Sequence, residues 1–220
     1  MSATEPIYVF DKDGVLVESE PIKLVRFEEL FEEEYAEYVP PIRALNRSEI
    51  GMARKEKLVL VFRDIIGLND EALSKTVDAY LERSYHFVKE ALLKAPALPG
   101  VIEFIHQSPN TKYVCSNALH AEVMDQLVTL QINDAFQKIF AFPDKKADVL
   151  ANLKLEHAPH PIVFWGDTKF DYEAAVSAEV AFIGLDKDSH NDFKGLNVHT
   201  IKDFTDQAGI RDWIVANAKL

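Results

Sequence analysis

The chain has 220 residues, of which 48% are hydrophobic and 27% charged, an ordinary balance for a globular protein with a sizeable core. Its formal net charge of −12 arises from 36 acidic and 24 basic residues. Because nucleic-acid phosphates require a basic surface, this charge argues against a nucleic-acid polymer as a partner. The same excess repels anions at long range, so a site for an anionic ligand must rely on local cations and a metal ion.

The cellular location is indicated by cysteine content and by the absence of targeting patterns. Cys115 is the only cysteine, which excludes an internal disulfide and favours a reducing cytoplasm. The N-terminal run MSATEPIYVFDKDG lacks the basic region and long apolar run of a signal peptide. No apolar stretch approaches the roughly 20 residues that span a bilayer. We therefore expect a cytoplasmic protein with no membrane partner.

Six short apolar runs predict β-strands. They are rich in β-branched and aromatic residues and alternate little, which is typical of strands buried on both faces of a parallel sheet. The runs are Ile7–Phe10, Tyr113–Cys115, Ile139–Phe142, Ile162–Trp165, Val180–Leu185 and the weaker Val198–Ile201. Helical patterns at Ala121–Leu130, Ala147–Leu155 and Asp171–Ala178 lie between the later runs. Strands alternating with helices predict an α/β fold with a doubly wound, Rossmann-like parallel sheet.

The interval from residue 18 to residue 95 contains no convincing strand. It predicts successive helices at Pro21–Tyr35, Glu49–Ile66 and Asp70–Leu93, with Pro40-Pro41 after the first of them. So long a helical interval exceeds a simple crossover connection. We therefore expect an α/β core domain made of residues 1–17 and 96–220, with an all-helical domain, residues 18–95, inserted in it.

Two carboxylates follow the first predicted strand, in the sequence DKDG. Asp11 and Asp13 are two residues apart, so in an extended chain their side chains point the same way, and Gly14 then permits a sharp turn. Crowded carboxylates repel unless a cation is present or one acid is protonated. Both conditions suit phosphoryl transfer. The alternative is an ordinary Asp-Gly turn at a strand end.

Polar residues also follow the second predicted strand. Ser116 and Asn117 come directly ahead of a predicted helix. A hydroxyl and backbone N–H groups at such a junction can hold a phosphoryl oxygen. The alternative is that Ser116 or Asn117 only caps the helix.

A lysine pair and two aspartates follow the next two predicted strands. Lys145 and Lys146 begin a helix, where a cation is unfavourable unless an anionic partner is near. Lys146 is closer to the apolar helix and is the favoured candidate, with solvated surface lysines as the alternative. Asp167 and Asp171 supply the oxygen ligands that Mg²⁺ prefers, although they also suit a capped helix start. Signals at four successive strand ends reinforce one another.

Taken together, these motifs resemble those of the haloacid dehalogenase-like (HAD) hydrolase superfamily. The motifs are Asp11–Val15, Ser116-Asn117, Lys146 and Gly166–Asp171. The resemblance covers nearly the whole chain, since the helical interval is similar to the cap domain that this family inserts after its first motif. The chain departs from close relatives in lacking a Lys-Pro-x-Pro-Asp run at Lys145-Lys146, which leaves the choice of lysine open, and in having Glu18 where aspartate is common.

The resemblance implies a Mg²⁺-dependent enzyme and a role for each matching residue. Asp11 is implied as the nucleophile that forms an aspartyl-phosphate, and Asp13 as the general acid and base whose backbone carbonyl also binds the metal. Ser116 and Asn117 are implied to bind the phosphoryl group. Lys146 is implied to neutralise both that group and Asp11. Asp167 is implied as a metal ligand, and Asp171 as a ligand or a neighbour of one.

The expected function is hydrolysis of a small phosphate monoester, with a phosphorylated metabolite as the substrate. Dehalogenases of the family generally lack an acid at the position of Asp13, which therefore argues for phosphate chemistry. A sugar phosphomutase with the same two aspartates is the alternative, and a non-catalytic phosphate-binding protein is a third reading. The basic segment Asn46–Lys55 either faces substrate or is a solvated helix start. The sequence predicts neither the particular substrate nor the oligomeric state.

Overall fold

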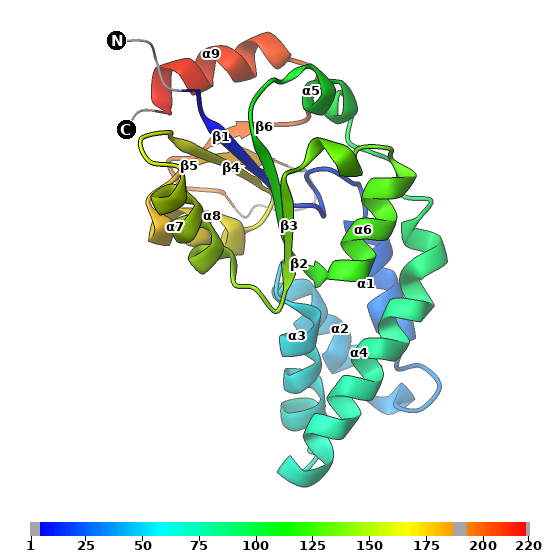
Figure 1. The fold of residues 1–220 in the computed structure, drawn as a ribbon. Helices are drawn as coiled ribbons and strands as arrows, with labels where there is room; N and C mark the ends of the chain where they lie inside the picture. Colours follow the sequence, from blue (N-terminus) through cyan, green and yellow to red (C-terminus); the bar gives the residue numbers. More distant parts are fainter. Residues whose placement is uncertain (1–4, 187–192, 219–220) are drawn as a thin grey trace. The chain divides into compact units, whose positions relative to one another are not determined.

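The computed structural model describes residues 5–186 and 193–218. The chain forms two compact units, residues 1–18 with 96–220 and residues 19–95 (Figure 1). We call the first the sheet unit and the second the helical unit.

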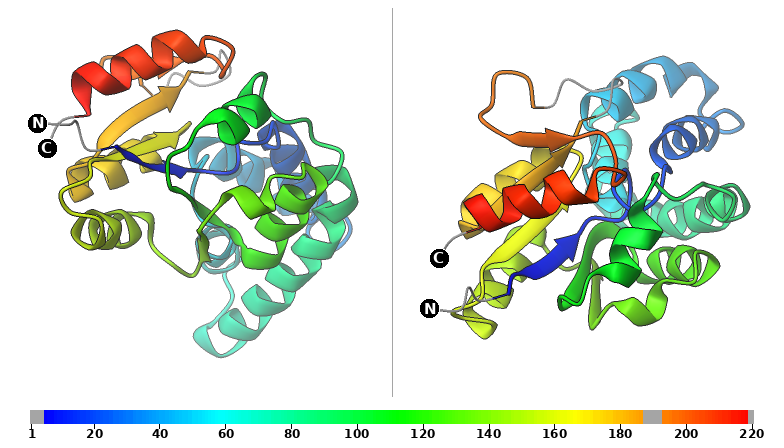
Figure 2. Two further views of the ribbon diagram at one scale, coloured as in Figure 1. Left: turned by 45° about the horizontal axis from the view of Figure 1, so that its top comes forward. Right: turned by 90° about the horizontal axis from the view of Figure 1, so that it is seen from above.

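The sheet unit contains a six-stranded parallel sheet. Its strands are β1 (Ile7–Phe10), β2 (Lys112–Leu119), β3 (Lys138–Phe142), β4 (Ile162–Gly166), β5 (Ala181–Leu185) and β6 (His199–Ile201). Their spatial order is β3-β2-β1-β4-β5-β6, and each neighbouring pair is parallel (Figures 1 and 2). Chain order runs outward in both directions from β1, so the predicted doubly wound α/β fold is confirmed.

The helices of the sheet unit are α5 (Val101–Gln107), α6 (His120–Thr129), α7 (Lys146–Glu156), α8 (Lys169–Ala178) and α9 (Gln207–Asn217). The predictions for α6 and α7 differ from these bounds by one residue at each end, and that for α8 starts two residues late and ends at the observed residue. Helices α5 and α9 were not predicted from the sequence. Helix α5 has only seven residues, so its apolar pattern is too short to recognise.

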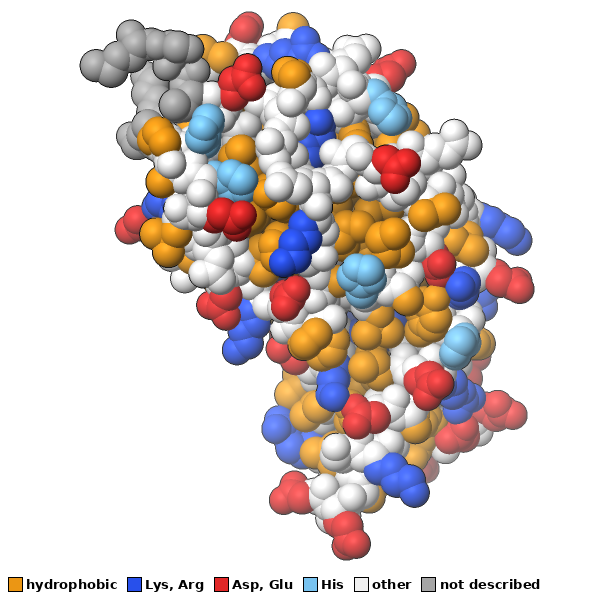
Figure 3. Space-filling view, in the orientation of Figure 1, with side chains coloured by type: hydrophobic (Ala, Val, Ile, Leu, Met, Phe, Trp, Pro, Cys, Tyr) orange, Lys and Arg blue, Asp and Glu red, His pale blue; other side chains and the backbone are white. Residues whose placement is uncertain are grey.

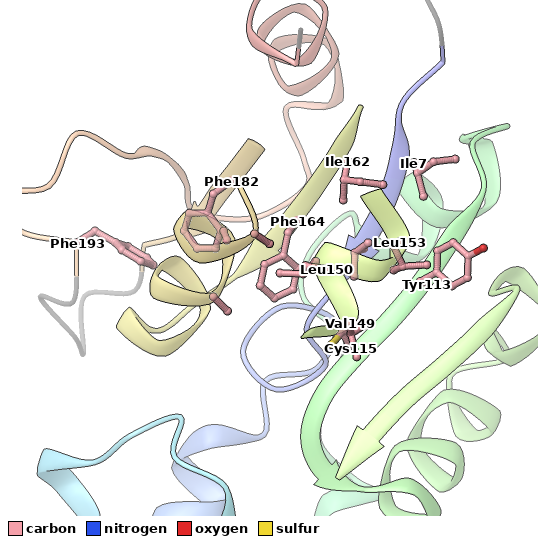
Figure 4. Packing of buried hydrophobic residues seen from close by; sticks show 14 residues of the cluster. Ile7, Tyr113, Cys115, Val149, Leu150, Leu153, Ile162, Phe164, Phe182 and Phe193 are labelled. Carbon is pink, nitrogen blue, oxygen red and sulfur yellow. The ribbon is translucent and has the colours of Figure 1, made fainter. Parts of the chain in front are cut away.

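Both faces of the sheet are buried by aromatic and aliphatic side chains. On one face, residues from β1, β2, β4 and β5 pack against α7 and α8, as Figure 4 shows for Ile7, Phe164 and Leu150. On the other face, the ring of Phe10 stacks on that of Trp165, with centroids 4.6 Å apart, and the ring of Phe104 from α5 covers this face. Since successive side chains of a strand point to opposite faces, this double burial explains why the strand sequences alternate so little.

The helical unit contains α1 (Glu20–Glu29), α2 (Val39–Ser48), α3 (Arg54–Leu60) and α4 (Asp70–Leu92). The predicted helix Pro21–Tyr35 was too long, because α1 ends at Glu29, and α2 was missed. Pro40 and Pro41 were interpreted as a break. They occupy the first turn of α2, where a missing N–H leaves no hydrogen bond unmade.

The core of the helical unit is aromatic and aliphatic, with contributions from all four helices and the π-helical turn Val61–Ile65 that continues α3. Its buried members are Phe27, Leu30, Phe31, Ile42, Leu58, Val61, Phe62, Val77 and Tyr80. At the start of α4, the Asn69 side chain accepts a hydrogen bond from Ala72 N, which caps the longest helix of the unit.

The two ends of the inserted segment meet within the sheet unit. The amide of Glu18 donates to the carbonyl of Pro96 at 2.9 Å, and the amide of Leu98 donates to the carbonyl of Leu16 at 3.2 Å. An isolated antiparallel bridge joins Val17 to Ala97. The chain therefore leaves and re-enters the sheet unit through adjacent segments, as an insertion requires.

The surface contains charges of both signs. On the face shown in Figure 3, acidic and basic side chains are interspersed without a continuous basic stripe among the coloured residues. Among the described residues, no helix has the length and apolar character needed to cross a membrane.

Candidate active site

The site lies at the carboxyl ends of the central strands. Asp11 directly follows β1 and Asp167 directly follows β4. These strands are neighbours, with Phe10 opposite Trp165, and the amide of Asp11 donates to the carbonyl of Trp165 at 2.8 Å. Open α/β sheets bind ligands at this edge because the strand order reverses here and leaves a crevice.

Three carboxylates meet at this edge. One oxygen each from Asp11, Asp167 and Asp171 lies within 4.8 Å of the others, and all three residues are buried. Asp11 is 5% exposed, Asp167 4% and Asp171 0%. Three buried acids so close together require a counter-charge.

Lys146 supplies part of that counter-charge. Its ammonium lies 2.8 Å from Asp11 Oδ2 and 2.5 Å from Asp171 Oδ1. Lys146 is the first residue of α7 and is 7% exposed, whereas Lys145 is exposed as the N-cap. The anionic partners expected for a lysine at this helix end are thus two carboxylates of the site.

Burial and the charge of the partner have opposite effects on the pKa of Asp11 and on that of Lys146. Burial raises the pKa of Asp11 to about 7, and the Lys146 ammonium only partly offsets that rise. Asp171 and Asp13 add to it by like-charge repulsion. Burial disfavours the charged form of Lys146, but the two carboxylates outweigh burial and raise the pKa of the ammonium above its ordinary value. The carboxylates thus favour the ammonium form of Lys146, whereas burial favours the neutral form of Asp11.

Asp171 has a structural role besides its contact with Lys146. Its Oδ2 accepts hydrogen bonds from Thr168 N at 3.1 Å and from Thr168 Oγ1 at 2.7 Å, and the Thr168 side chain in turn faces the amide of Asp171. This reciprocal capping box begins α8. The capped helix start that the sequence left open is therefore present, and the same carboxylate also holds Lys146.

Two glycines make room for the acids. Gly14 has φ +73°, and a Cβ atom there would overlap the carboxylate of Asp167. A Cβ atom at Gly166 would overlap the side chain of Asp171. From the sequence, Gly14 was expected only to permit a turn, and no packing role was predicted for Gly166. In each case the absent Cβ permits close approach of an acid.

Asp13 lies beside this cluster and is not one of its three acids. Strand β1 ends at Phe10, so the alternation of an extended chain, used to place Asp13 on the same side as Asp11, does not apply here. The Asp13 carboxylate pairs instead with the ammonium of Lys12, with Oδ1 and Nζ 2.8 Å apart. Lys12 was not predicted to be a functional residue, although a lysine between two acids directly after a buried strand is a visible signal in the sequence.

Ser116 and Asn117 lie inside β2, not at the start of a helix. Helix α6 begins at His120 with Leu119 as its N-cap, so neither residue caps it. The Ser116 hydroxyl accepts a hydrogen bond from Ala118 N at 3.2 Å and is buried. Because β1 and β2 pair with Phe10 opposite Val114, Ser116 lies on the strand beside the loop that carries Asp11.

The donor set fits a magnesium ion. Mg²⁺ takes hard oxygen ligands, and here carboxylate oxygens converge from the ends of two neighbouring strands and the first turn of α8. Ionised, three carboxylates and the one ammonium of Lys146 leave an excess of two negative charges, which a divalent cation neutralises.

A Rossmann-like sheet with an acid cluster after β1 and β4 and a helical insertion after β1 defines the class of HAD-like proteins. The family model of the haloacid dehalogenase-like hydrolases matches the sequence of this chain over residues 8–185. The chain therefore belongs to this family of hydrolases, and the resemblance inferred from its motifs is confirmed.

Relatives and solved structures agree with this assignment. A curated relative from Thermotoga maritima, named phosphorylated carbohydrates phosphatase, is 25% identical over 86% of this chain and 88% of its own. A hydrolase from Pseudomonas syringae has the same fold, with a TM-score of 0.74 at 19% identity over 96% of this chain and 99% of that one. A β-phosphoglucomutase from Clostridium difficile superposes with a TM-score of 0.70 at 17% identity, over 96% of this chain and 99% of that one.

Proposed function

We propose that this protein is a magnesium-dependent phosphatase that hydrolyses small phosphate monoesters through an aspartyl-phosphate on Asp11. The observation that carries the proposal is the position of Asp11. Its buried carboxylate follows the central strand, 2.8 Å from the Lys146 ammonium and within 4.8 Å of two further acids. This arrangement can neutralise both an attacking carboxylate and a phosphoryl group, which is what phosphoryl transfer requires of a protein.

In the first step, a carboxylate oxygen of Asp11 attacks phosphorus. The bond between phosphorus and the ester oxygen breaks, and that oxygen takes a proton from Asp13 and departs as an alcohol. Lys146 stabilises the negative charge on the phosphoryl oxygens, and Ser116 and Asn117 donate hydrogen bonds to them. The product is an acyl phosphate on Asp11.

In the second step, water attacks the phosphorus of the acyl phosphate. Asp13, now ionised, takes a proton from that water while the bond between phosphorus and the Asp11 oxygen breaks. Inorganic phosphate leaves, and both aspartates return to their starting states. One group thus serves as acid and then as base, so the proton balance closes over the cycle.

Magnesium is proposed to be held by Asp11 and Asp167 and by the backbone carbonyl of Asp13, with Asp171 as a further ligand or as a neighbour of the ligands. When bound, it supplies positive charge that keeps Asp11 ionised and offsets the charge of the phosphoryl group. We assign Asp171 chiefly to orienting Lys146, because both of its oxygens already accept hydrogen bonds.

The proposed substrate class is phosphorylated carbohydrates and similar small metabolites. The name of the Thermotoga maritima relative supports this class. The helical unit is proposed to correspond to the cap domain of the family, a proposal that its insertion after β1 supports. The buried free thiol of Cys115 supports a location in the reducing cytoplasm.

A sugar phosphomutase is the second candidate, because it needs the same pair of aspartates. In that reaction the phosphoryl group on Asp11 passes to a sugar hydroxyl and not to water. Incubation with phosphosugars, with phosphate release and sugar isomers both measured, separates the two functions. Free phosphate as the main product supports the phosphatase, and isomerised phosphosugar without phosphate release supports the mutase.

Asp11→Asn tests the proposed nucleophile. Wild-type protein should release phosphate from an aryl phosphate with Mg²⁺ and lose this activity in EDTA, and Asp11→Asn should release none. Wild-type protein quenched in acid during turnover should carry phosphate that hydroxylamine removes, as an acyl phosphate does. The matched control is Asp148→Asn, an exposed aspartate on α7. Unchanged turnover in Asp11→Asn would refute the nucleophile, and no turnover by wild type on any ester would point to a phosphate-binding protein.

A further inference from the structure

The motif after β1 contains a residue to which the chemistry above gives no role. Lys12 lies between the two proposed catalytic aspartates, and its side chain is 0% exposed. An ammonium removed from water is strongly unfavourable unless charged and hydrogen-bonding partners surround it. The partners of Lys12 therefore indicate what the residue does.

Lys12 joins Asp13 to helix α6. Its Nζ lies 2.8 Å from Asp13 Oδ1 and 3.3 Å from Glu122 Oε1, and it also donates a hydrogen bond to Gln126 Oε1. Glu122 and Gln126 are one turn apart on α6, and each is 2% exposed. The ammonium is therefore anchored on a helix of the sheet unit, and Asp13 is anchored on the ammonium.

The backbone of Lys12 also makes hydrogen bonds within the loop that follows β1. Its carbonyl accepts hydrogen bonds from the amides of Leu16 at 2.9 Å and Val17 at 3.0 Å, and its amide donates to Asp11 Oδ1 at 2.7 Å. The loop is therefore compact at the backbone, and the side-chain contact adds a restraint on the rotation of the Asp13 carboxylate.

Stability alone is a poor explanation for this arrangement. Replacing a buried ion pair by apolar side chains of similar volume is often neutral or stabilising, so a buried pair does not by itself stabilise a fold. The two aspartates of the motif nevertheless each have a buried ammonium at 2.8 Å, Lys146 for Asp11 and Lys12 for Asp13. The first pair neutralises the nucleophile, and the second holds the acid that must face the leaving group.

We propose that Lys12 is a positioning residue for Asp13, an inference that rests on the proposed phosphatase function. By holding Oδ1, the ammonium orients the carboxyl group so that its other oxygen gives the proton to the ester oxygen as the bond to phosphorus breaks. Proper orientation matters most when the leaving group is an aliphatic alcohol, because an alkoxide cannot depart without a proton. Lys12 thereby adapts the site to esters of aliphatic alcohols, the class to which most sugar phosphates belong.

The test is the dependence of kcat/KM on the leaving group. Lys12→Met removes the ammonium and keeps the length of the side chain. It should lower kcat/KM for glycerol phosphate by about 10²-fold, the lower range for loss of general acid catalysis, and for p-nitrophenyl phosphate by only a few fold. Lys202→Met, at an exposed lysine of the sheet unit, is the matched control and should change neither value. Equal losses for the two esters in Lys12→Met overturn the proposal.

A double-mutant cycle separates positioning from a general effect on the fold. If Lys12 acts through Asp13, Lys12→Met should cause no further loss of kcat/KM in an Asp13→Asn background. Losses that multiply in the double variant overturn the proposal. Where Lys12→Met does not fold, Gln126→Met removes one anchor of the ammonium and should give the same leaving-group pattern at smaller amplitude. An equal effect of Gln126→Met on both esters overturns it as well.

The outcome also distinguishes this inference from the proposed function. Turnover by wild type that Asp11→Asn abolishes, combined with equal losses in Lys12→Met, overturns the role of Lys12 alone. No turnover by wild type on these two esters or on any other phosphate monoester overturns both.

Discussion

Gly14 and Asp167 occupy adjoining space, so that a Cβ atom at residue 14 would overlap the Asp167 carboxylate. The turn after β1 and the end of β4 are far apart in sequence and in direct contact in the structure. Glycine is required at residue 14 for two reasons, the left-handed backbone at φ +73° and the approach of the acid.

Gly14→Ala should therefore weaken metal binding as well as stability. The left-handed backbone alone makes alanine less favourable by about 1–2 kcal/mol. The displaced carboxylate should in addition lower Mg²⁺ affinity by about tenfold or more, measured by calorimetric titration. Gly195→Ala is the matched control, because Gly195 has φ +82° and nothing within 4 Å of an added Cβ. Equal Mg²⁺ affinity in the two variants contradicts the role given to the contact with Asp167.

Substitution of Lys146 should lower kcat strongly, whereas substitution of its neighbour Lys145 should not. Lys146→Met leaves Asp11 and Asp171 without their ammonium and should lower kcat by about 10²-fold or more, because a cation that stabilises transition-state charge is lost. Lys145→Met changes an exposed side chain and should keep wild-type kcat, with a change in unfolding free energy within about 0.5 kcal/mol. Steady-state kinetics and denaturant titration of both variants check this. A larger kcat loss in Lys145→Met reverses the assignment.

Ionisation of Asp11 should make the effect of Mg²⁺ on stability depend on pH. Burial raises the pKa of Asp11 from 3.8 to about 7 in the folded protein. Since the folded value is the higher one, this group's contribution to stability is fully present below about pH 3.8 and is lost as pH rises through about 7. A divalent cation binds the ionised carboxylate, so Mg²⁺ should raise Tm more at about pH 8 than at about pH 5.5.

The control for this pH dependence is Asp11→Asn, which has a similar shape and no ionisable group. The difference between the two Mg²⁺-induced Tm shifts should shrink in that variant, because the proton no longer competes with the metal at residue 11. Thermal scans with and without Mg²⁺ at both pH values measure it. Identical shifts at the two pH values in the wild type argue against a titrating Asp11.

Cys115 should report unfolding. It is 1% exposed on β2, and burial raises the pKa of its thiol to about 12, so the native protein holds it as an unreactive thiol. Reaction with an aromatic disulfide reagent should be slow in native buffer and should accelerate with denaturant in parallel with the loss of circular dichroism. Fast labelling of the native protein is the contrary result, and it indicates local opening of β2 next to the site.

Much of the architecture is determined by local sequence patterns. Strand β1 is predicted at its observed bounds, Ile7–Phe10, and the other strands within a few residues, because burial on both faces requires continuous apolar runs. The acids after β1 and β4 mark the edge of the sheet for the same reason, since the chain becomes polar where the strand ends. Family membership also follows from the sequence, because its motifs are short runs within single segments.

The elements that were missed are those whose signals depend on context. Pro40 and Pro41 indicate a break when read alone, yet they begin α2, because the first turn of a helix needs no N–H donor. Helices α5 and α9 went unpredicted. The seven residues of α5 carry too little periodicity to distinguish it from a loop, and its burial against β1 becomes visible only when the sheet is assembled.

Only the tertiary structure shows which charged side chains of the site form ion pairs with one another. Sequence spacing could not show that Lys12 reaches α6 through Glu122 and Gln126, or that Asp171 both caps α8 and holds Lys146. Residue type and order determine what each segment can form on its own. The partner of a buried charge is set by the packing of segments distant in sequence, since an ion pair acts over a few ångströms between side chains that the fold brings together.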